Sequence, residues 1–334
     1  MTRSLITGAC GQDGYYLAKH LITLGHEVIV TARSGPRLQA EYEGMRVRTA
    51  ILDVTDSGMV RALLKATKPD HIYNLAAQSH VGLSYASPES TAAVNYGGVL
   101  NLLEAIRGTD IKMYQASTSE MFGNSDRKQN ERTPMEPESP YAIAKTAAHN
   151  LCEMYRRSYG VFVACGILFN HESPRRPDFF LPRKVAKGLV EIVKGKREKL
   201  QLGNPKAYRD WGWAPEYVTI MPNMLEMGRP YTMVIGTGEA ASVRDLVFTA
   251  CQHLGIHHKM DQYVEWKKTE KRPSEVDFLR ADITRAKSLM GWKPQYKMSE
   301  VIRMLIRHEE EVQDEDFQKE EEPEERLDHP SEYD

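Results

Sequence analysis

Short apolar runs alternate with longer amphipathic stretches along the first half of the chain. The short runs predict buried strands, and the longer stretches, in which apolar residues recur every three or four positions, predict helices. The predicted strands are residues 4–7, 27–32, 46–52, 71–75, 112–117 and 161–167, with a further strand at 231–236. The predicted helices are residues 15–24, 59–66, 91–107 and 141–158. This alternation indicates a parallel sheet covered on both faces.

The right-handed crossover rule then predicts an α/β fold with a doubly wound, Rossmann-type parallel sheet. After Phe169, prolines and basic residues become frequent and strands become fewer, which indicates a smaller C-terminal α/β domain that binds the substrate. We expect the first domain to span residues 1–168 with a return segment at about 211–240, and the second to comprise residues 169–210 and 241–312. Residues 313–334 are acidic and poor in apolar residues, which predicts a disordered tail.

Composition and charge exclude several classes of protein. The 334 residues carry 44 basic and 46 acidic side chains, and the net charge of −2 gives no support for binding nucleic acid or an anionic membrane. No apolar run approaches the roughly 20 residues of a membrane span, and the N-terminal stretch has no signal-peptide pattern. The four cysteines and 11 histidines show no metal-ligand spacing. We therefore expect a cytoplasmic protein without a metal site.

The stretch TGACGQDG follows the first predicted strand and opens the first helix. Gly8 permits a tight turn, Gly11 lets a pyrophosphate approach the backbone, and Gly14 lets the helix pack against the strand. The helix N-terminus then faces the anion. Because a purely structural turn needs only one glycine, this stretch predicts a dinucleotide-binding loop that includes Gln12 and Asp13.

The end of the second predicted strand, TARSG, indicates which dinucleotide binds. NAD-binding proteins usually place an acid there to hold the ribose hydroxyls. This strand has no acid, and Arg33 can bind a 2′-phosphate, so we expect NADP as the cofactor. Further cofactor contacts are expected after the third and fourth strands, at Asp53, Val54, Leu75, Ala76, Ala77 and Ser79.

The motif SPYAIAK places Tyr141 and Lys145 one turn apart on the same face of a helix. Ser139 can cap that helix, and Pro140 suits its first turn. A tyrosine has a pKa of about 10, which is too high for a base at neutral pH. Since a nearby ammonium favours the phenolate, we expect Lys145 to lower the pKa of Tyr141.

The stretch QASTSEMFG ends the fifth predicted strand with three hydroxyl side chains followed by a carboxylate, Glu120. A capped strand end needs one hydroxyl, which explains Ser117 but does not explain the acid. In doubly wound folds, ligands bind at the carboxyl ends of the strands. We therefore interpret this strand end as part of the ligand site.

These motifs, in this order, resemble the extended short-chain dehydrogenase/reductase superfamily and, more closely, its GDP-mannose 4,6-dehydratases. The closer resemblance rests on the stretches LAAQSHV, YQASTSEMFG, SPYAIAK, ILFNHESPRR, YRDWG, TGEAASVRDLV, RPSEVDFLRAD and GWKP, which extend over roughly residues 1–308. NHESPRR and RPSEVDFL are far more specific than the superfamily pattern.

The resemblance implies a reaction that converts GDP-mannose to GDP-4-keto-6-deoxymannose. Tyr141, assisted by Lys145, would take the proton of the sugar 4-hydroxyl while a hydride passes from C4 to NADP. The new ketone acidifies the C5 proton, which Glu120 would remove while it assists loss of water from C6. The hydride would then return to C6. Thr118 occupies the family's position for a hydrogen bond to the 4-hydroxyl.

The resemblance also implies binding residues in the second half of the chain. Those expected to line the cofactor or the pocket near the nicotinamide are His171 and Arg176. Those expected to contact the GDP-sugar are Asn170, Lys184, Arg209, Arg272 and Glu275. The planar fork of an arginine suits a diphosphate, which is the expected ligand of both arginines in the second group.

Three alternatives stay open at this point. A 4,6-dehydratase for a related nucleotide sugar, such as GDP-manno-heptose, would need the same residues. A reductase or epimerase of the superfamily would have no use for Glu120 beside Thr118. A non-catalytic regulator that senses NADP would be expected to lose Tyr141, Lys145 or Glu120, and all three are present.

The chain also departs from the family pattern. The segment after Arg33, SGPRLQAEYEG, is shorter than the family's loop, which helps bind the cofactor across a tetramer interface. We therefore expect a homodimer, with a homotetramer as the alternative. Ser90 stands where the family tends to carry a tyrosine, and Tyr208 replaces a basic residue before Arg209, a change that bears on the preferred sugar nucleotide.

Overall fold

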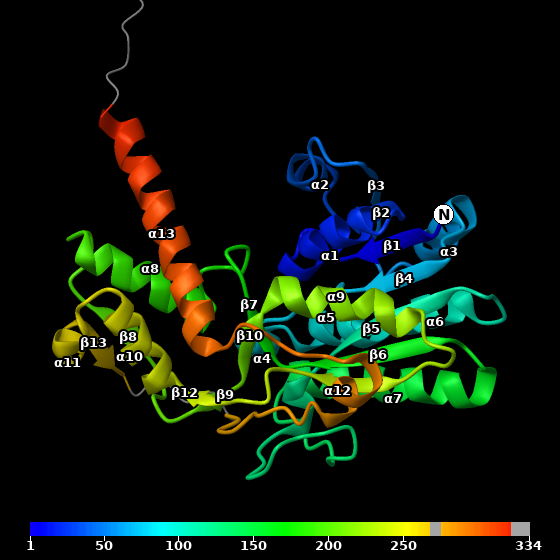
Figure 1. The fold of residues 1–334 in the computed structure, drawn as a ribbon. Coiled ribbons are helices and arrows are strands. Elements are labelled where there is room, and N and C mark those ends of the chain that lie inside the picture. The colour runs from blue at the N-terminus through cyan, green and yellow to red at the C-terminus, as the bar shows by residue number, and fades with distance from the viewer. Residues whose placement is uncertain (268–274, 322–334) are drawn as a thin grey trace, which may run out of the picture.

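The computed structural model describes residues 1–267 and 275–321, with side chains described to residue 314. A seven-stranded sheet lies at its centre, and neighbouring strands in it are parallel. In spatial order its strands are β11 (Thr232–Ile235), β6 (Val163–Leu168), β5 (Lys112–Thr118), β4 (His71–Asn74), β1 (Arg3–Thr7), β2 (Glu27–Ala32) and β3 (Val47–Ile51). Helices cover both faces (Figure 1). The predicted doubly wound fold is confirmed.

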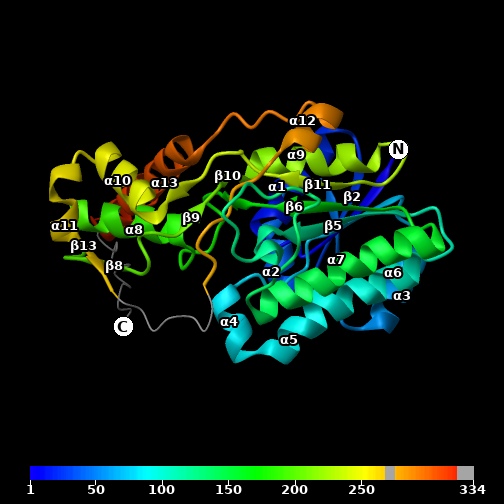
Figure 2. The same cartoon turned by 90° about the horizontal axis from the view of Figure 1, so that it is seen from below.

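Two apolar clusters hold helices against the sheet. One cluster joins α1 and α9 to one face through residues such as Leu17 and Tyr217, and the other joins α3, α6 and α7 to the opposite face through residues such as Leu103 and Cys152. Figure 2 shows α9 on one side of the sheet and α3, α6 and α7 on the other. The helices of this part are α1 (Gln12–Thr23), α2 (Gly35–Glu41), α3 (Ser57–Thr67), α4 (Val81–Ala86), α5 (Pro88–Ala92), α6 (Gly98–Ile106), α7 (Pro140–Tyr159), α9 (Ala214–Leu225) and α12 (Thr284–Met290).

The helix predicted at residues 91–107 is divided by a π-helical turn, η1 (Ala93–Gly97), between α5 and α6. The turn holds the buried Asn95 against the backbone of Gln78. Asn95 Nδ2 donates to the Gln78 carbonyl (3.0 Å), and the Gln78 N–H donates to Asn95 Oδ1 (2.9 Å). Such a turn is a local deviation within a helix, often at a functional site. The apolar pattern did not reveal it because these contacts are polar and far apart in sequence.

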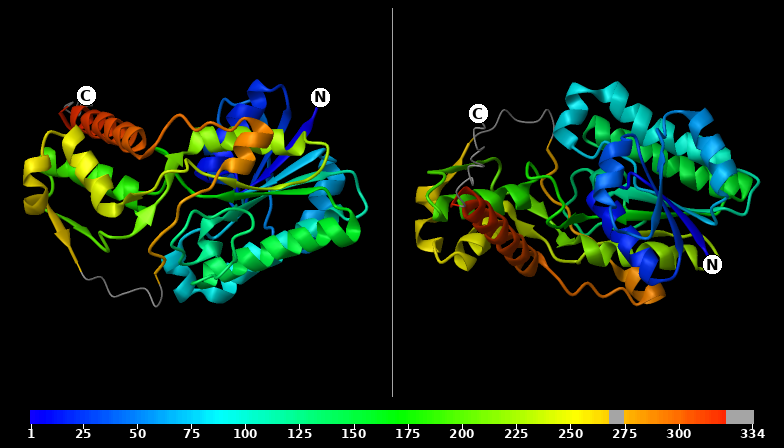
Figure 3. Two further views of the ribbon diagram at one scale, coloured as in Figure 1. Left: turned by 60° about the horizontal axis from the view of Figure 1, so that its bottom comes forward. Right: turned by 90° about the horizontal axis from the view of Figure 1, so that it is seen from above.

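A separate apolar cluster holds what we call the C-terminal lobe, and its core includes Leu189, Val247 and Leu305. Figure 3 shows the lobe beside the central sheet. Its elements are α8 (Leu181–Val193), β8 (Leu200–Leu202), α10 (Val243–His253), the 3-10 helix η3 (His257–Lys259), α11 (Met260–Tyr263), β13 (Val264–Trp266) and α13 (Met298–Glu321). The exact domain boundaries stay a prediction.

Helix α13 extends into the segment that the sequence predicted to be disordered. It runs to Glu321, so residues 313–321 are helical, whereas residues 322–334 lie outside the described residues. Lys194, directly after α8, pairs with Asp314 (2.6 Å) and donates to the Glu310 carbonyl (3.2 Å). These contacts hold the helix where apolar residues have become sparse.

Short strands connect the sheet to the C-terminal lobe. β7 (Asn170–Glu172) pairs in parallel with β10 (Trp211–Trp213), and β9 (Tyr208–Arg209) pairs antiparallel with β12 (Ala241–Ser242). Between β9 and β10, the fully buried Asp210 accepts hydrogen bonds from both the N–H and the hydroxyl of Thr237 (2.8 and 2.6 Å). It also accepts from the N–H groups of Gly238 (2.9 Å) and Ala281 (3.2 Å). One carboxylate thus joins three separate segments.

A chain of side-chain hydrogen bonds crosses the carboxyl ends of β1, β4 and β5. Thr7 Oγ1 donates to Asn74 Oδ1 (2.6 Å), and Asn74 Nδ2 donates to Gln115 Oε1 (2.7 Å). Gln115 Nε2 then donates to the carbonyl of Ala116 (2.8 Å). Thr7, Asn74 and Gln115 are all buried. These bonds link the carboxyl ends of three neighbouring strands.

Asp210→Asn should lower the free energy of unfolding by about 2–4 kcal/mol, because the amide NH₂ would face backbone N–H donors and leave them unpaired. Urea unfolding followed by circular dichroism measures the change. Asp178→Asn is the matched control, since the Asp178–Lys187 pair lies at the surface and should contribute about 1 kcal/mol or less. Equal effects of the two substitutions would contradict the anchoring role of Asp210.

Candidate active site

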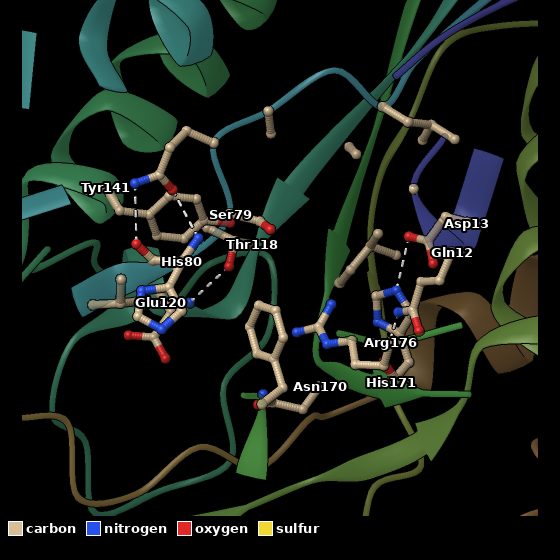
Figure 4. A pocket seen from close by; sticks show the side chains of 18 of the residues that line it. Gln12, Asp13, Ser79, His80, Thr118, Glu120, Tyr141, Asn170, His171 and Arg176 are labelled. Carbon is tan, nitrogen blue, oxygen red and sulfur yellow. Dashed lines mark hydrogen bonds and ion pairs between the residues drawn. The ribbon is translucent and has the colours of Figure 1, made fainter. Parts of the chain in front are cut away.

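A cavity of about 1460 Å³ lies between the carboxyl edge of the sheet and the C-terminal lobe, and Figure 4 shows part of its lining. The predicted site residues that line it are Gly8, Gly11, Gln12, Asp13, Gly14, Arg33, Asp53, Val54, Leu75, Ala76, Ala77, Ser79, Thr118, Glu120, Tyr141, Lys145, Asn170, His171, Arg176, Lys184, Arg209 and Glu275. Arg272 lies outside the described residues. The structure thus brings the others together, while their individual roles stay predictions.

The glycine-rich loop between β1 and α1 packs too closely for larger residues. Gly8 has φ of +67°, and a Cβ there would come within 2.7 Å of the backbone of Leu75 and Ala76. A Cβ on Gly14 would approach the Cα of Ala9 to 2.6 Å. The loop therefore keeps its N–H groups and the N-terminus of α1 open to the cavity, an arrangement that fits the pyrophosphate of a dinucleotide.

Basic residues gather where β2 ends. Arg33 is exposed at the cavity edge, and Arg37 of α2 also lines the cavity and donates to the Cys10 carbonyl (3.4 Å). Two hydrogen bonds from Thr55 are the main cause that lowers the pKa of Asp53, and the charge of Arg33 contributes less. Sequence analysis missed Arg37, although it stands four residues after Arg33 in the shortened segment.

The start of α7 places the tyrosine and lysine as the sequence predicted. Ser139 accepts a hydrogen bond from the Ala142 N–H (3.1 Å) and so caps the helix, and Pro140 occupies its first turn. Tyr141 and Lys145 are both buried and both line the cavity.

The electrostatics of this pair differ from the prediction. Burial raises the pKa of Tyr141 to about 12, against the opposing effect of a hydrogen bond with Thr118. Burial also lowers the pKa of Lys145 to about 8, and its Nζ donates to the Ala116 carbonyl (2.6 Å). The prediction that Lys145 lowers the pKa of Tyr141 is therefore wrong for the protein by itself, because desolvation outweighs any charge effect.

The hydroxyl residues at the end of β5 make different contacts. Ser117 Oγ lies 2.8 Å from His149 Nδ1 behind the strand, which agrees with a structural role. Thr118 caps the 3-10 helix η2 (Ser119–Phe122) by accepting from the Glu120 N–H (3.3 Å). The short helix turns the half-buried Glu120 into the same cavity as Tyr141. The negative charge of Glu120 is close enough to help raise the pKa of Tyr141.

Several cavity residues escaped the sequence analysis. His80 caps α4 by accepting from the Leu83 N–H (2.9 Å), and its ring lies 5.1 Å from that of Phe179. The Arg176 guanidinium lies 3.6 Å above the ring of Phe180, and Asn204 lines the same cavity. His80 directly follows the predicted cofactor residue Ser79, and this position could have identified it as a cavity residue. No sequence pattern distinguishes the two phenylalanines from core residues.

A family model described as GDP-mannose 4,6 dehydratase matches residues 5–305. GDP-mannose 4,6 dehydratase 2 of Arabidopsis thaliana is 41% identical over 320 residues, which cover 91% of this chain and 85% of that protein. The chain belongs to the GDP-mannose 4,6-dehydratase family. The GDP-mannose 4,6 dehydratase of Homo sapiens is 39% identical, with 91% of this chain and 90% of that protein covered. The family resemblance seen in the sequence is confirmed.

Solved structures agree with this family's fold. UDP-glucose 4-epimerase of Thermus thermophilus, solved with NAD, superposes with a TM-score of 0.82 at 23% identity and covers 92% of this chain and 99% of its own. dTDP-glucose 4,6-dehydratase of Bacillus anthracis, also solved with NAD, has a TM-score of 0.82 at 19% identity and covers 94% and 98%. At these identities the likeness establishes the architecture alone.

None of the helices among the described residues is long and apolar enough to cross a membrane. Within residues 1–267 and 275–321, no three His, Cys, Asp or Glu side chains gather as metal ligands would.

Proposed function

We propose that this protein is an NADP-dependent GDP-mannose 4,6-dehydratase, which removes water across C5 and C6 and leaves a ketone at C4. The observation that supports this most is the presence of Glu120 in one cavity with Thr118 and Tyr141, in a member of this family. A simple dehydrogenase needs a hydroxyl and a tyrosine at this point. The added carboxylate is what an elimination requires, so it also argues against a reductase or an epimerase.

Each residue has a stated task in this proposal. Thr118 orients the 4-hydroxyl, and Tyr141 takes its proton. The bound cofactor would accept the C4 hydride and return it to C6. Glu120 takes the C5 proton and passes it to the departing C6 hydroxyl, so one water leaves. Tyr141 supplies the proton that C5 regains, and neither the enzyme nor the cofactor is changed overall.

The pKa of Tyr141 limits when it can act as a base. At a pKa of about 12 the phenol is protonated near neutral pH. A positive charge close to the hydroxyl would favour the phenolate. We propose that cofactor binding supplies this charge. The pKa of Lys145 is about 8, so the protonation state of Lys145 can change with the same charge.

We propose NADP because two arginines, Arg33 and Arg37, border the cavity where β2 ends, and this strand end carries no acid. A guanidinium binds a phosphate well, whereas the ribose hydroxyls of NAD are usually bound by a carboxylate.

A cytoplasmic homodimer is also part of the proposal. The exposed apolar side chain of Ile143 on the long helix α7 supports a surface that a second copy covers.

Glu120→Gln should abolish dehydration while cofactor binding is kept, because an amide cannot accept the C5 proton. Wild-type protein with NADP and GDP-mannose should give a product lighter by one water, without net NADPH. The variant should stop at the ketone and show bound reduced cofactor in a single turnover. The exposed Glu136→Gln is the control and should behave as wild type.

Normal dehydration by Glu120→Gln would show that another group is the base. Mass analysis over a panel of GDP-, UDP-, dTDP- and CDP-sugars, with GDP-manno-heptose included, distinguishes the related substrates. Steady accumulation of NADPH by the wild type would instead indicate a simple dehydrogenase.

Arg33→Ala and Arg37→Ala should each raise the KM for NADP by about tenfold, the effect of losing roughly 1.4 kcal/mol of a charge-assisted hydrogen bond. The KM for NAD should change little, because NAD lacks the 2′-phosphate. Arg46→Ala is the control, since Arg46 is exposed but does not line the cavity. Parallel increases in both KM values would contradict a phosphate contact.

A further inference from the structure

Two neighbouring side chains of the glycine-rich loop reach across to β7. Gln12 Nε2 donates to the His171 carbonyl (2.8 Å), and Ser173 Oγ donates to Gln12 Oε1 (2.9 Å). Asp13 Oδ2 lies 2.8 Å from His171 Nε2. Figure 4 shows Gln12 and Asp13 beside His171, away from Tyr141 and Glu120. We call these four residues, Gln12, Asp13, His171 and Ser173, the loop–strand latch.

The hydrogen bonds of His171 define its charge. Its Nδ1 lies 2.7 Å from the Phe169 carbonyl, which can only accept. Its Nε2 faces the Asp13 carboxylate, which also accepts. Both ring nitrogens must therefore donate, and only the imidazolium does so. The ring stacks on the buried Tyr217 with centroids 4.6 Å apart, an arrangement that favours a cation.

Charged and titratable groups surround His171 on several elements. They are Asp13 of α1, Glu172 of β7, Arg176 of the following loop and Tyr217 of α9. Burial alone would lower the pKa of His171, but the charge and hydrogen bond of Asp13 more than offset it and raise the pKa above its ordinary 6.5. Burial likewise opposes the ionisation of Asp13, yet pairing with His171 lowers its pKa.

The pairing of Asp13 with His171 bears on cofactor binding because of where Asp13 lies. Asp13 stands in the first turn of α1, where the N–H groups of the helix end would bind a pyrophosphate. Its Oδ1 is buried and has no hydrogen-bond partner among the described residues. An unpaired carboxylate there would repel a phosphate group. The His171 cation cancels that charge, and Arg176 adds a second positive charge nearby.

We propose that His171 is a positioning residue for the cofactor: it neutralises Asp13 at the N-terminus of α1 and fixes the glycine-rich loop to β7. The inference rests on the dinucleotide of the proposed function. It gives a specific role to Gln12, Asp13 and His171, which the sequence analysis expects near the cofactor. β7 begins with Asn170, which is expected to contact the substrate. The latch therefore also fixes the position of the glycine-rich loop relative to the sugar site.

Three variants of the full-length protein test the proposal by calorimetric titration with NADP. His171→Gln leaves Asp13 as an unpaired anion and should weaken NADP binding by about tenfold or more. Asp13→Asn removes the charge itself and should weaken binding by less than about threefold. The double variant should bind more tightly than His171→Gln, because the repelling charge is gone. Asp178→Asn, an exposed acid of the same segment, is the control and should leave binding unchanged.

If the loop–strand latch only stabilised the fold, the variants would give a different result. Equal weakening by His171→Gln and Asp13→Asn, or a double variant worse than both, would overturn the electrostatic role. Thermal unfolding of each variant reports stability separately from binding. Failure of wild-type protein to bind NADP or NAD would overturn the proposed cofactor and this inference together, whereas binding that no latch variant alters would overturn this inference alone.

A pH series keeps the proposal testable where His171→Gln does not fold. As pH rises through the raised pKa of His171, the imidazolium is lost and Asp13 becomes unpaired, so wild-type NADP binding should weaken. Asp13→Asn should remove this part of the pH dependence while retaining any that arises from Lys145. Identical pH profiles for Asp13→Asn and wild type would overturn the proposal.

Discussion

The buried chain of hydrogen bonds from Thr7 through Asn74 and Gln115 to the Ala116 carbonyl is the interaction on which the site depends. It begins next to the glycine-rich loop and ends at the carbonyl that also accepts from Lys145. The carboxyl ends of three parallel strands are thereby linked. A slip of one residue would turn every side chain along a strand to the opposite face and separate the glycine-rich loop from the helix that carries Tyr141.

Local chemistry made much of this predictable from the sequence. The short apolar runs identified the strands, the glycine spacing located the loop, and Ser139 and Pro140 marked the start of the helix that carries Tyr141. In each case the residue type and its neighbours in the sequence indicate the local conformation.

What could not be predicted depends on contacts between distant segments. Asn95 of the π turn exchanges two hydrogen bonds with the backbone of Gln78, which lies in another segment. The pKa of Tyr141 is raised because the folded protein desolvates it, and the spacing of Tyr141 and Lys145 does not show how deeply the phenol is buried. The same holds for Asp13, whose charge is neutralised by His171, a residue that lies far along the chain.

The site therefore combines two kinds of electrostatic control. At the cofactor end, a buried cation cancels a carboxylate, so that the helix N-terminus can attract phosphate. Around Tyr141, burial raises the pKa of the phenol and lowers the pKa of Lys145, so the neutral form of each side chain is favoured. The proposed elimination adds Glu120, a half-buried acid that can exchange a proton with the sugar and pass it to the leaving hydroxyl.

The reaction in heavy water, with product analysed by NMR, tests this account most directly. If Glu120 removes the C5 proton and Tyr141 returns the exchangeable proton of the 4-hydroxyl to C5, while the hydride stays within the active site, the product must carry deuterium at C5. It must carry none from solvent at C6, and substrate labelled at C4 must deliver its label to C6. Product without solvent deuterium at C5, or with solvent deuterium at C6, would contradict the proposed elimination.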